Sequence, residues 1–573
     1  MYMPVRPRPK KTNIIRSRSG CKSCRERRTK CDEQKPSCGT CTRLRKPCES
    51  VCPELRFHVV TGPSPSYIAS EGPKAGSSVT GEERNGVGHD GLWIPDLDLV
   101  KSLQHTERDV FYTTYWEDVC LPAVHPMFAP ISLSAWDKPM LKDTILALSS
   151  CNLSRIRPDR KGSSSSHIGI FSPNLIHQTR SQLYYSSAIE KFVALKRADV
   201  QSNATTIFIV LVLFAYIESS MGNFQGFQCH VQGLANFAIE LPEVIGDTTI
   251  KALLTAWMQV RFVVWWARAY FSTIYIHRGL PPVHLPRLLD GCFESIQARR
   301  VLVLSIMCES HRLNSRNMLG HWCQAEGRDL TVEAHHESTS DASETIYLQL
   351  GEQAKKLGEW LLHLPSSEQP VPLGQSEVLH SACNLQYSDV PIRFISHDAA
   401  LNFSYYVVAR IMQCTSSLRQ FQHPNSDQYE PSCSEEETWI RVLLRIAKAT
   451  SMKDSISKNT YTIGFSGLML PAILRCQNVS LGIEIQNWLE SLERLQPTEE
   501  GAFPVYQTLG VVKAINQQRM IGREIFGVTL STDDAGGTPK FTAYNSQSIS
   551  SLLLHGRCPV SGKFLTESVS IDL

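Results

Sequence analysis

Six of the 18 cysteines in this 573-residue chain lie close together near the N-terminus, at spacings that suit metal binding. They follow the pattern C-x2-C-x6-C-x6-C-x2-C-x6-C, and the second triplet repeats the first at a constant offset of 17 residues. The six are Cys21, Cys24, Cys31, Cys38, Cys41 and Cys48. A C-x2-C pair can place two sulfurs on one ion, and the third cysteine of each triplet returns to the same side. Each half therefore supplies three thiolates, one fewer than the four that structural zinc prefers.

Six thiolates can complete the coordination of two Zn²⁺ ions if two sulfurs bridge both ions. By the symmetry of the repeat, the bridging pair should contain one cysteine from each half. Sulfur would then fill every coordination position, so the zinc would be structural and leave no position for a reactive water. A disulfide scaffold would need an oxidising compartment, and residues 1–11 lack the apolar stretch of a secretory signal. An isolated redox pair would not need four further cysteines in register.

Charge is distributed unevenly along the chain, although the net charge is only +3. Residues 1–48 contain 15 Lys and Arg against 3 Asp and Glu, whereas the remaining residues contain 43 against 52. With six thiolates and two Zn²⁺ bound, the basic segment would still carry a charge of about +10. Such a charge favours nucleic acid and predicts binding that weakens steeply with salt. The basic run in residues 6–18 fits either phosphate contacts or a nuclear import signal.

The basic residues between the second and third cysteines could read DNA directly. They are Arg25, Arg27, Arg28 and Lys30, opposed only by Glu26. An arginine can donate two hydrogen bonds to O6 and N7 of guanine in the major groove. Single-stranded nucleic acid or RNA is a weaker alternative, because no Phe, Tyr or Trp lies between Cys21 and Cys48 to stack on bases.

Residues 19–49, SGCKSCRERRTKCDEQKPSCGTCTRLRKPCE, resemble the motif of the fungal binuclear zinc cluster transcription factors. The match includes the basic run, Asp32 after the third cysteine, and Pro36 in the loop before the fourth. The resemblance implies that Cys21 and Cys38 are the bridging sulfurs, and that each half is a short helix followed by an extended strand. One zinc would take Cys21, Cys24, Cys31 and Cys38, and the other would take Cys38, Cys41, Cys48 and Cys21.

The same resemblance implies roles for the basic residues. Arg27 and Arg28 would read bases of a CGG-type triplet, although many members of that family carry lysine at these two positions. The phosphate contacts would come from Lys22, Arg25 and Lys30, which position the module without reading sequence.

The segment after the cysteines predicts a flexible linker over residues 51–100, because 15 of the 31 residues in 61–91 are Gly, Pro or Ser. Residues 49–90 show no sustained heptad, so we expect either monomeric DNA binding or a homodimer formed through the rest of the chain. The sequence WIPDLDL at residues 93–99 could be a small activation motif, but the start of the next folded unit is favoured.

Residues 101–530 predict a large all-α domain, followed by a C-terminal tail at 531–573. Helical periodicity is present in residues 182–195, 439–449 and 481–495, and residues 205–218 are apolar all round. The apolar run 207–217 is about half the length of a spanning helix, and Arg261 and Arg268 interrupt the run 251–276. We expect both to be buried helices, with no membrane as partner. Loops are predicted at 158–173, 327–344 and 421–437.

This region resembles, more loosely, the regulatory domain that follows the cluster in many of these factors. The similar segments are FYTTYWEDVCLPAVHP at 111–126, QCHVQGLANFA at 228–238 and GFSGLMLPAIL at 464–474. The resemblance implies an all-α domain that is controlled by ligands or by transcription co-regulators.

Motifs of catalysis are missing from the sequence. The second glycine of Gly464-Phe465-Ser466-Gly467 comes one residue too early for a nucleophile elbow, and His335-His336 lacks the spacing of a zinc protease. The aromatic stripe of Trp257, Phe262, Trp265 and Trp266 is more typical of a core than of a cofactor site. We therefore expect a nuclear, double-stranded-DNA-binding regulator of RNA polymerase II genes and not an enzyme. The alternative is a metabolic enzyme or small-molecule sensor with a basic zinc-binding head.

Overall fold

The computed structural model divides the chain into two compact units, Met1–Gly91 and Leu92–Leu573. Within them it describes the following residues: 23–24, 29, 31–32, 37–44, 48, 105–132, 135–156, 173–196, 199, 203–221, 224–240, 247–271, 280–282, 284–325, 339–371, 390–415, 435–495, 499–501, 503–530 and 551–570. The predicted linker and the WIPDLDL segment lie outside these ranges, as do most of the three predicted loops.

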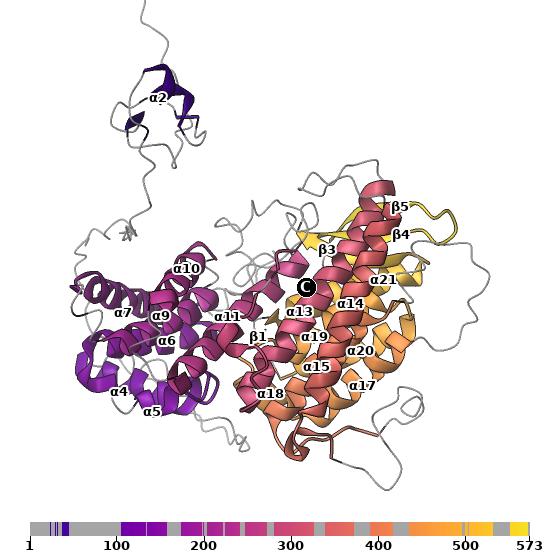
Figure 1. Ribbon diagram of the computed structural model, residues 1–573. Coiled ribbons are helices and arrows are strands. Elements are labelled where there is room, and N and C mark those ends of the chain that lie inside the picture. Colours follow the sequence, from indigo (N-terminus) through magenta and orange to yellow (C-terminus); the bar gives the residue numbers. More distant parts are fainter. Residues whose placement is uncertain are drawn as a thin grey trace, which may run out of the picture. The chain divides into compact units, whose positions relative to one another are not determined.

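The larger unit is mostly helical, with its elements running through Figure 1 from violet to yellow. Its first group of helices is α4 (His105–Tyr115), the π-helix η1 (Trp116–Cys120), α5 (Phe128–Ser132), the short 3-10 helix η2 (Ala135–Asp137), α6 (Pro139–Ile156), α7 (Leu175–Val193), α9 (Ala204–Met221), α10 (Phe224–Glu240) and α11 (Asp247–Phe271). The second group is η3 (Arg287–Leu289), α13 (Ile296–Ala325), α14 (Thr339–Leu362), η4 (Ser366–Glu368), α15 (His397–Gln413), α17 (Glu435–Ala449), α18 (Met452–Lys458), α19 (Phe465–Arg475), α20 (Val479–Glu493) and α21 (Val505–Met520). These bounds confirm the helices predicted from periodicity.

One continuous hydrophobic core joins the two groups of helices. Helix α9 packs against α6, α10 and α11, while α13 packs against α11, α14 and α15. Figure 1 shows α11 between the two groups, where it contacts members of both. The aromatic stripe of α11 is part of this core, since Trp266 is fully buried and donates from Nε1 to the carbonyl oxygen of Gly467 at 3.0 Å. The prediction that this stripe is core is confirmed.

Helix α9 is the one helix of the described residues that is long and apolar enough to cross a membrane. It has 18 residues and a mean hydropathy of 1.8, so it is longer than the apolar run 207–217 indicates. However, 78% of it is buried inside the unit against neighbouring helices. A helix that is hydrophobic all round and surrounded by protein is a core helix, as its sequence predicts.

The expectation of an all-α domain is wrong at its C-terminal end. The strands β3 (Glu524–Leu530), β4 (Ser551–Arg557) and β5 (Phe564–Ser570) form an antiparallel sheet in that order, and β1 (Glu499–Glu500) pairs with β2 (Phe503–Pro504). Strand β3 contacts α11, α19 and α21, so the sheet continues the core. The predicted boundary at residue 530 therefore falls between two strands that pair with each other. The sequence SLLLHGR of β4 has three consecutive leucines, and a strand of this kind lacks the polar-apolar alternation that identifies strands.

A buried carboxylate organises the start of α19. Glu500 has no exposed surface, and its carboxylate accepts hydrogen bonds from the backbone N–H groups of Phe465 and Ser466. It also accepts from Ser466 Oγ at 2.7 Å and from Asn459 Nδ2 at 2.7 Å. These donors satisfy the negative charge at the positive end of the helix dipole. A Cβ at Gly464 would lie 2.3 Å from Glu500 Oε1, so only glycine leaves room for this carboxylate. Ser466 is therefore a structural hydrogen-bond donor in the segment that superficially resembles a nucleophile elbow.

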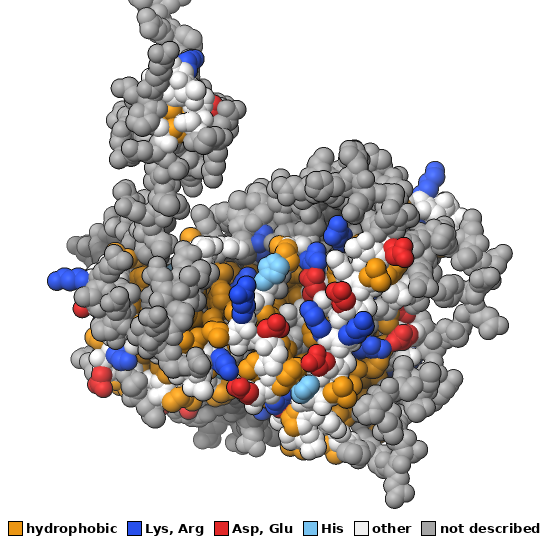
Figure 2. Space-filling view, in the orientation of Figure 1, with side chains coloured by type: hydrophobic (Ala, Val, Ile, Leu, Met, Phe, Trp, Pro, Cys, Tyr) orange, Lys and Arg blue, Asp and Glu red, His pale blue; other side chains and the backbone are white. Residues whose placement is uncertain are grey.

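The surface of the larger unit carries charges of both signs. Figure 2 shows basic, acidic and hydrophobic side chains mixed over the face that it presents. On this face the described residues form no broad basic surface of the kind that the sequence predicts for residues 1–48.

Candidate metal centre

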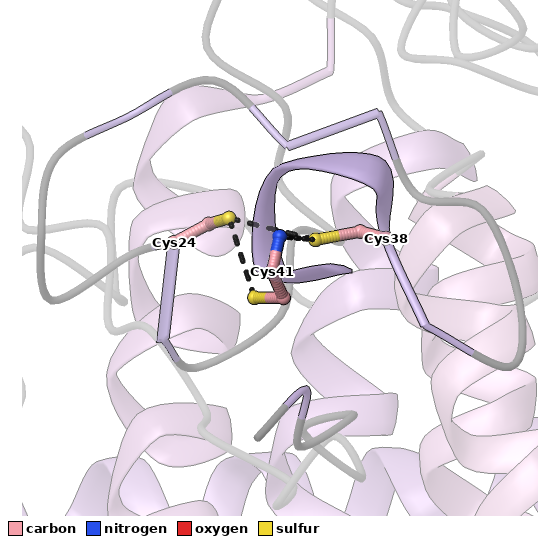
Figure 3. Close-up of side chains that lie close together, drawn as sticks. All are labelled: Cys24, Cys38 and Cys41. Atoms are coloured by element: carbon pink, nitrogen blue, oxygen red, sulfur yellow. Dashed lines mark hydrogen bonds between the residues drawn. The ribbon is translucent and has the colours of Figure 1, made fainter. Parts of the chain in front are cut away.

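Three of the predicted zinc ligands converge in the N-terminal unit. The sulfur of Cys24 lies 3.7 Å from that of Cys38 and 4.0 Å from that of Cys41, and Figure 3 shows the three side chains pointing toward one another. All three are at most 1% exposed. Cys24 comes from the first half of the repeat and the other two from the second half, so the two halves meet here.

A second group of possible ligands shares one member with the first. Ligand atoms of Cys31, Asp32 and Cys38 lie within 4.8 Å of one another, as do those of Cys24, Cys38 and Cys41. Cys38 belongs to both groups. Cys48 packs against the buried cysteines, and its sulfur accepts the backbone N–H of Cys38 at 3.3 Å.

These residues fit zinc. Four sulfurs at about 2.3 Å from a tetrahedral Zn²⁺ lie about 3.8 Å from one another, and the distance between Cys24 and Cys38 is 3.7 Å. A disulfide would need sulfurs about 2.05 Å apart, and the described cysteines of this group are free thiols. The Cys38 sulfur lies within 4.8 Å of the sulfurs of Cys24 and Cys31 from the first half of the repeat and of Cys41 from the second, as a sulfur that bridges two ions requires.

Backbone N–H groups are aimed at the sulfurs. Helix α2 (Gly39–Arg43) begins after Cys38, whose sulfur accepts the N–H of Cys41 at 3.4 Å. Together with the N–H of Cys38 that points at Cys48, this arrangement places positive backbone dipoles against two sulfurs. Such donors stabilise the thiolate form, which is the form that binds metal. The short helix thus serves to hold its cysteines at ligand spacing, as the resemblance implied for each half.

Asp32 has a positioning role that its type and spacing alone did not reveal. Both of its carboxylate oxygens accept the backbone N–H of Gly39, each at 3.0 Å. The contact joins the residue after the third cysteine to the first turn of α2, which contains Cys41. It therefore connects the two halves of the repeat through the protein as well as through any shared metal.

The remaining predicted site residues lie outside the described part of the chain. These are Cys21 and the five basic residues Lys22, Arg25, Arg27, Arg28 and Lys30. Their roles stay predictions.

The buried cysteines of the larger unit have a different environment. Burial raises the pKa of the Cys151 thiol to about 11 and raises the pKa of Cys120 further. A thiol with a raised pKa is protonated at neutral pH, so it is a poor metal ligand and a poor nucleophile. These cysteines behave as small apolar core residues.

Comparison with known proteins agrees with the geometry. Residues 19–55 match the sequence model of the Fungal Zn(2)-Cys(6) binuclear cluster domain. The transcriptional regulatory protein moc3 of Schizosaccharomyces pombe is 37% identical over 103 residues, which cover 15% of this chain and 20% of the relative. The sterol uptake control protein 2 of Candida albicans is 58% identical over 33 residues, or 6% of this chain and 5% of the relative. The lysine biosynthesis regulatory protein LYS14 of Saccharomyces cerevisiae is 50% identical over 42 residues, or 7% of this chain and 5% of the relative.

The chain thus spans a fifth or less of the length of these curated relatives, and no solved structure matches it. The three relatives are named as a transcriptional regulatory protein, a sterol uptake control protein and a lysine biosynthesis regulatory protein. Residues 19–55 of this chain therefore form a fungal Zn(2)-Cys(6) binuclear cluster domain, a domain that binds two zinc ions.

Proposed function

We propose that this chain is a sequence-specific DNA-binding regulator of RNA polymerase II genes that acts in the nucleus. The observation that carries the proposal is the cluster of buried cysteine sulfurs, drawn from both halves of a repeat whose loops are strongly basic. One relative is named a transcriptional regulatory protein and another a regulatory protein of lysine biosynthesis, and no recognised catalytic motif is present in the sequence.

The ligand set of the proposal is the full cysteine repeat. One ion takes Cys21, Cys24, Cys31 and Cys38, and the second takes Cys38, Cys41, Cys48 and Cys21. Cys38 lies within ligand distance of Cys24 and Cys31 of the first half and of Cys41 of the second, which supports its bridging role. Zinc would supply structural rigidity here, because sulfur fills every coordination position and the buried side chains in the described part of this module are cysteines.

The DNA contacts divide into base-reading and positioning residues. Arg27 and Arg28 donate to the guanines of a CGG-type triplet in the major groove, while Lys22, Arg25 and Lys30 hold phosphates.

Transcription co-regulators bind the helical unit, and a homodimer forms through that unit. Two relatives are named for sterol uptake and lysine biosynthesis, and we propose that this chain controls metabolic genes, specifically a specialised-metabolite gene cluster. Genome-wide mapping of occupied sites tests that last step.

The alternative is that the zinc-binding head only tethers a metabolic enzyme or a sensor. It predicts DNA binding without sequence preference. A comparison of three arginine variants separates the two functions, because each variant removes one positive charge from the same module.

The experiment measures binding of the zinc-loaded chain to a duplex with a CGG triplet and to one with the triplet scrambled. Arg28→Ala should weaken binding to the CGG duplex by about 1–3 kcal/mol and leave binding to the scrambled duplex nearly unchanged. Arg25→Ala should weaken both duplexes equally and lower the dependence on salt. Arg43→Ala is the matched control, because Arg43 is exposed at the end of α2 and occupies the repeat position of Glu26. Equal losses on both duplexes for Arg28→Ala would show that Arg28 contacts only phosphate and would contradict base reading.

A further inference from the structure

A polar pocket of about 220 Å³ lies inside the larger unit, far along the sequence from the cysteine repeat. Its walls come from the loop before α5 and from α9, α11, α13, the start of α15 and the end of α18. Helices α13, α15 and α18 are neighbours in Figure 1. The residues that line it span positions 122 to 462, so the pocket exists only in the folded unit.

A buried guanidinium forms one wall of the pocket. Arg300 is 5% exposed; its Nε donates to Asn402 Oδ1 at 2.7 Å and its Nη2 donates to Asp398 Oδ1 at 2.7 Å. These two bonds fix the plane of the guanidinium. A guanidinium has five N–H groups, and within the described residues Nη1 makes no further hydrogen bond. The side chain is therefore held in place with donor capacity left over.

Two histidines line the pocket, and each has one ring nitrogen without a partner among the described residues. His125 is 7% exposed and its Nδ1 accepts the N–H of Met127, so its proton lies on Nε2, which has no partner among the described residues. His397 donates from Nε2 to Asn459 Oδ1 at 2.8 Å, which leaves its Nδ1 without a partner among the described residues. Asn459 donates from its Nδ2 to Glu500, which fixes its Oδ1 as the acceptor toward His397. Both rings line the pocket, but these two nitrogens have almost no accessible surface, so a ligand in the pocket does not reach them.

Both rings are neutral at physiological pH. Burial and, to a smaller extent, the neighbouring Arg300 cation lower the pKa of His125 to about 3. Burial also lowers the pKa of His397. An uncharged His125 is then a donor at Nε2 only, as its contact with Met127 requires.

The charge of the pocket is positive. Arg300 and Lys458 are cations, while Asp398 is the one carboxylate among the lining residues, and Arg300 holds its pKa below the usual value. The net charge of these three groups is about +1, which matches a single carboxylate. The volume is smaller than the roughly 300–1,000 Å³ of sites for drug-sized ligands, so the ligand should have few atoms.

We propose that this pocket binds a small monocarboxylate. The carboxylate lies between Arg300 and Lys458. Such a ligand would contact elements from both groups of helices, so its binding would stabilise the larger unit. The proposal does not depend on DNA binding, because its readout is ligand binding alone.

The test uses the full, zinc-loaded chain and three probes of nearly equal size: L-lactate, L-lactamide and propionate. Lactate has a carboxylate and a hydroxyl, lactamide lacks the charge, and propionate lacks the hydroxyl. Ligand-observed NMR and the melting temperature report binding up to roughly 10 mM probe, with sodium chloride added to keep the ionic strength constant. Lactate and propionate should each bind at least about 10-fold more tightly than lactamide.

Two lysines on α18 supply a matched pair of variants. Lys458 lines the pocket and its only described ion pair is a long contact of 3.8 Å with Asp454, whereas Lys453 is exposed on the same helix and does not line the pocket. Lys458→Gln should weaken lactate binding about 3- to 10-fold, and Lys453→Gln should leave it unchanged. Arg300→Gln should lower lactate binding below detection. Because this substitution also removes the hydrogen bonds to Asn402 and Asp398, the comparison of the two lysine variants is the test of the proposal.

Three results would overturn the proposal. If none of the probes binds at roughly 10 mM, the pocket holds water only. Equal binding of lactate and lactamide would exclude recognition of charge. Equal effects of Lys458→Gln and Lys453→Gln would place the lactate at another site.

Discussion

The two units of this protein have interiors of different chemistry. Among the described residues of the N-terminal unit, the buried side chains are four cysteines, with a fifth packed against them. The larger unit is built around a continuous core of aliphatic and aromatic side chains, including the fully buried Trp116, Trp266 and Trp360. A segment as short as the cysteine repeat cannot bury enough apolar surface to fold alone, so metal–sulfur bonds must replace the missing core.

The described cysteines of the cluster and the buried cysteines of the larger unit differ in their surroundings. In the cluster, N–H groups point at sulfurs that lie at ligand spacing. In the larger unit, burial raises the pKa of Cys151 and holds it as a neutral thiol. Stability should therefore respond to metal in one unit and to packing in the other, and four predictions test this separation.

The largest effect should come from removing zinc. Chelation should unfold the cluster and abolish DNA binding, because zinc contributes about 10–16 kcal/mol to the folding of comparable small modules. The thermal transition of the larger unit should not move. Differential scanning calorimetry with and without chelator, together with zinc analysis, checks both. About two zinc ions per chain are expected. A single ion per chain, or DNA binding that is insensitive to chelator, would contradict the two-ion cluster.

The substitution Trp266→Ala should destabilise the larger unit and leave the zinc cluster intact. It removes a fully buried side chain and its hydrogen bond to Gly467, so the larger unit should lose about 3–5 kcal/mol of stability. Zinc content should stay the same. Trp136→Ala is the control, because Trp136 is 37% exposed on η2 and should cost much less. Loss of zinc from Trp266→Ala would show that the units are coupled.

Alanine substitutions at two helical glycines of the larger unit should change its stability by smaller amounts and in opposite directions. A Cβ at Gly467 of α19 would lie 2.6 Å from the ring of Phe503, so Gly467→Ala should destabilise by about 1–3 kcal/mol through overpacking. A Cβ at Gly351 of α14 meets nothing within 4 Å, and Gly351→Ala should stabilise by about 0.5–1 kcal/mol because alanine favours helix. Urea unfolding measures both. The same sign for the two variants would contradict the packing shown around α19.

The last prediction is a dependence on pH that belongs to the larger unit. The pKa of His125 is about 3 in the folded chain and near 6.5 when unfolded, so above pH 6.5 both states are neutral and the full stability is present. As the pH falls below 6.5, only the unfolded state gains the proton, and stability falls by about 1.4 kcal/mol per pH unit until the folded pKa is reached. His125→Gln should lose about 1 kcal/mol less than the wild type between pH 6 and 5. An unchanged slope in urea unfolding over this range would show that His125 already titrates normally in the folded state.

Much of the helical architecture could be predicted from sequence, because periodicity is a local property. The apolar pattern of 205–218 lies within α9, and that of 439–449 lies within α17. Strands β4 and β5 could not be predicted, because their stability comes from pairing across the sheet and from the contacts of β3 with α11 and α19. The role of Ser466 was also hidden, since its partner Glu500 lies 34 residues away.

The sequence by itself determined the metal chemistry, because all the ligands of a zinc cluster can come from one short segment whose spacing sets which sulfurs reach one ion. It also determined the basic charge beside those ligands. Only the tertiary structure decided the capping of α19 by Glu500, the sheet at the C-terminal end and the pocket that joins Arg300, His125 and His397. The physical reason is distance along the chain: contacts between residues far apart in sequence depend on how the whole core packs, and no local pattern encodes them.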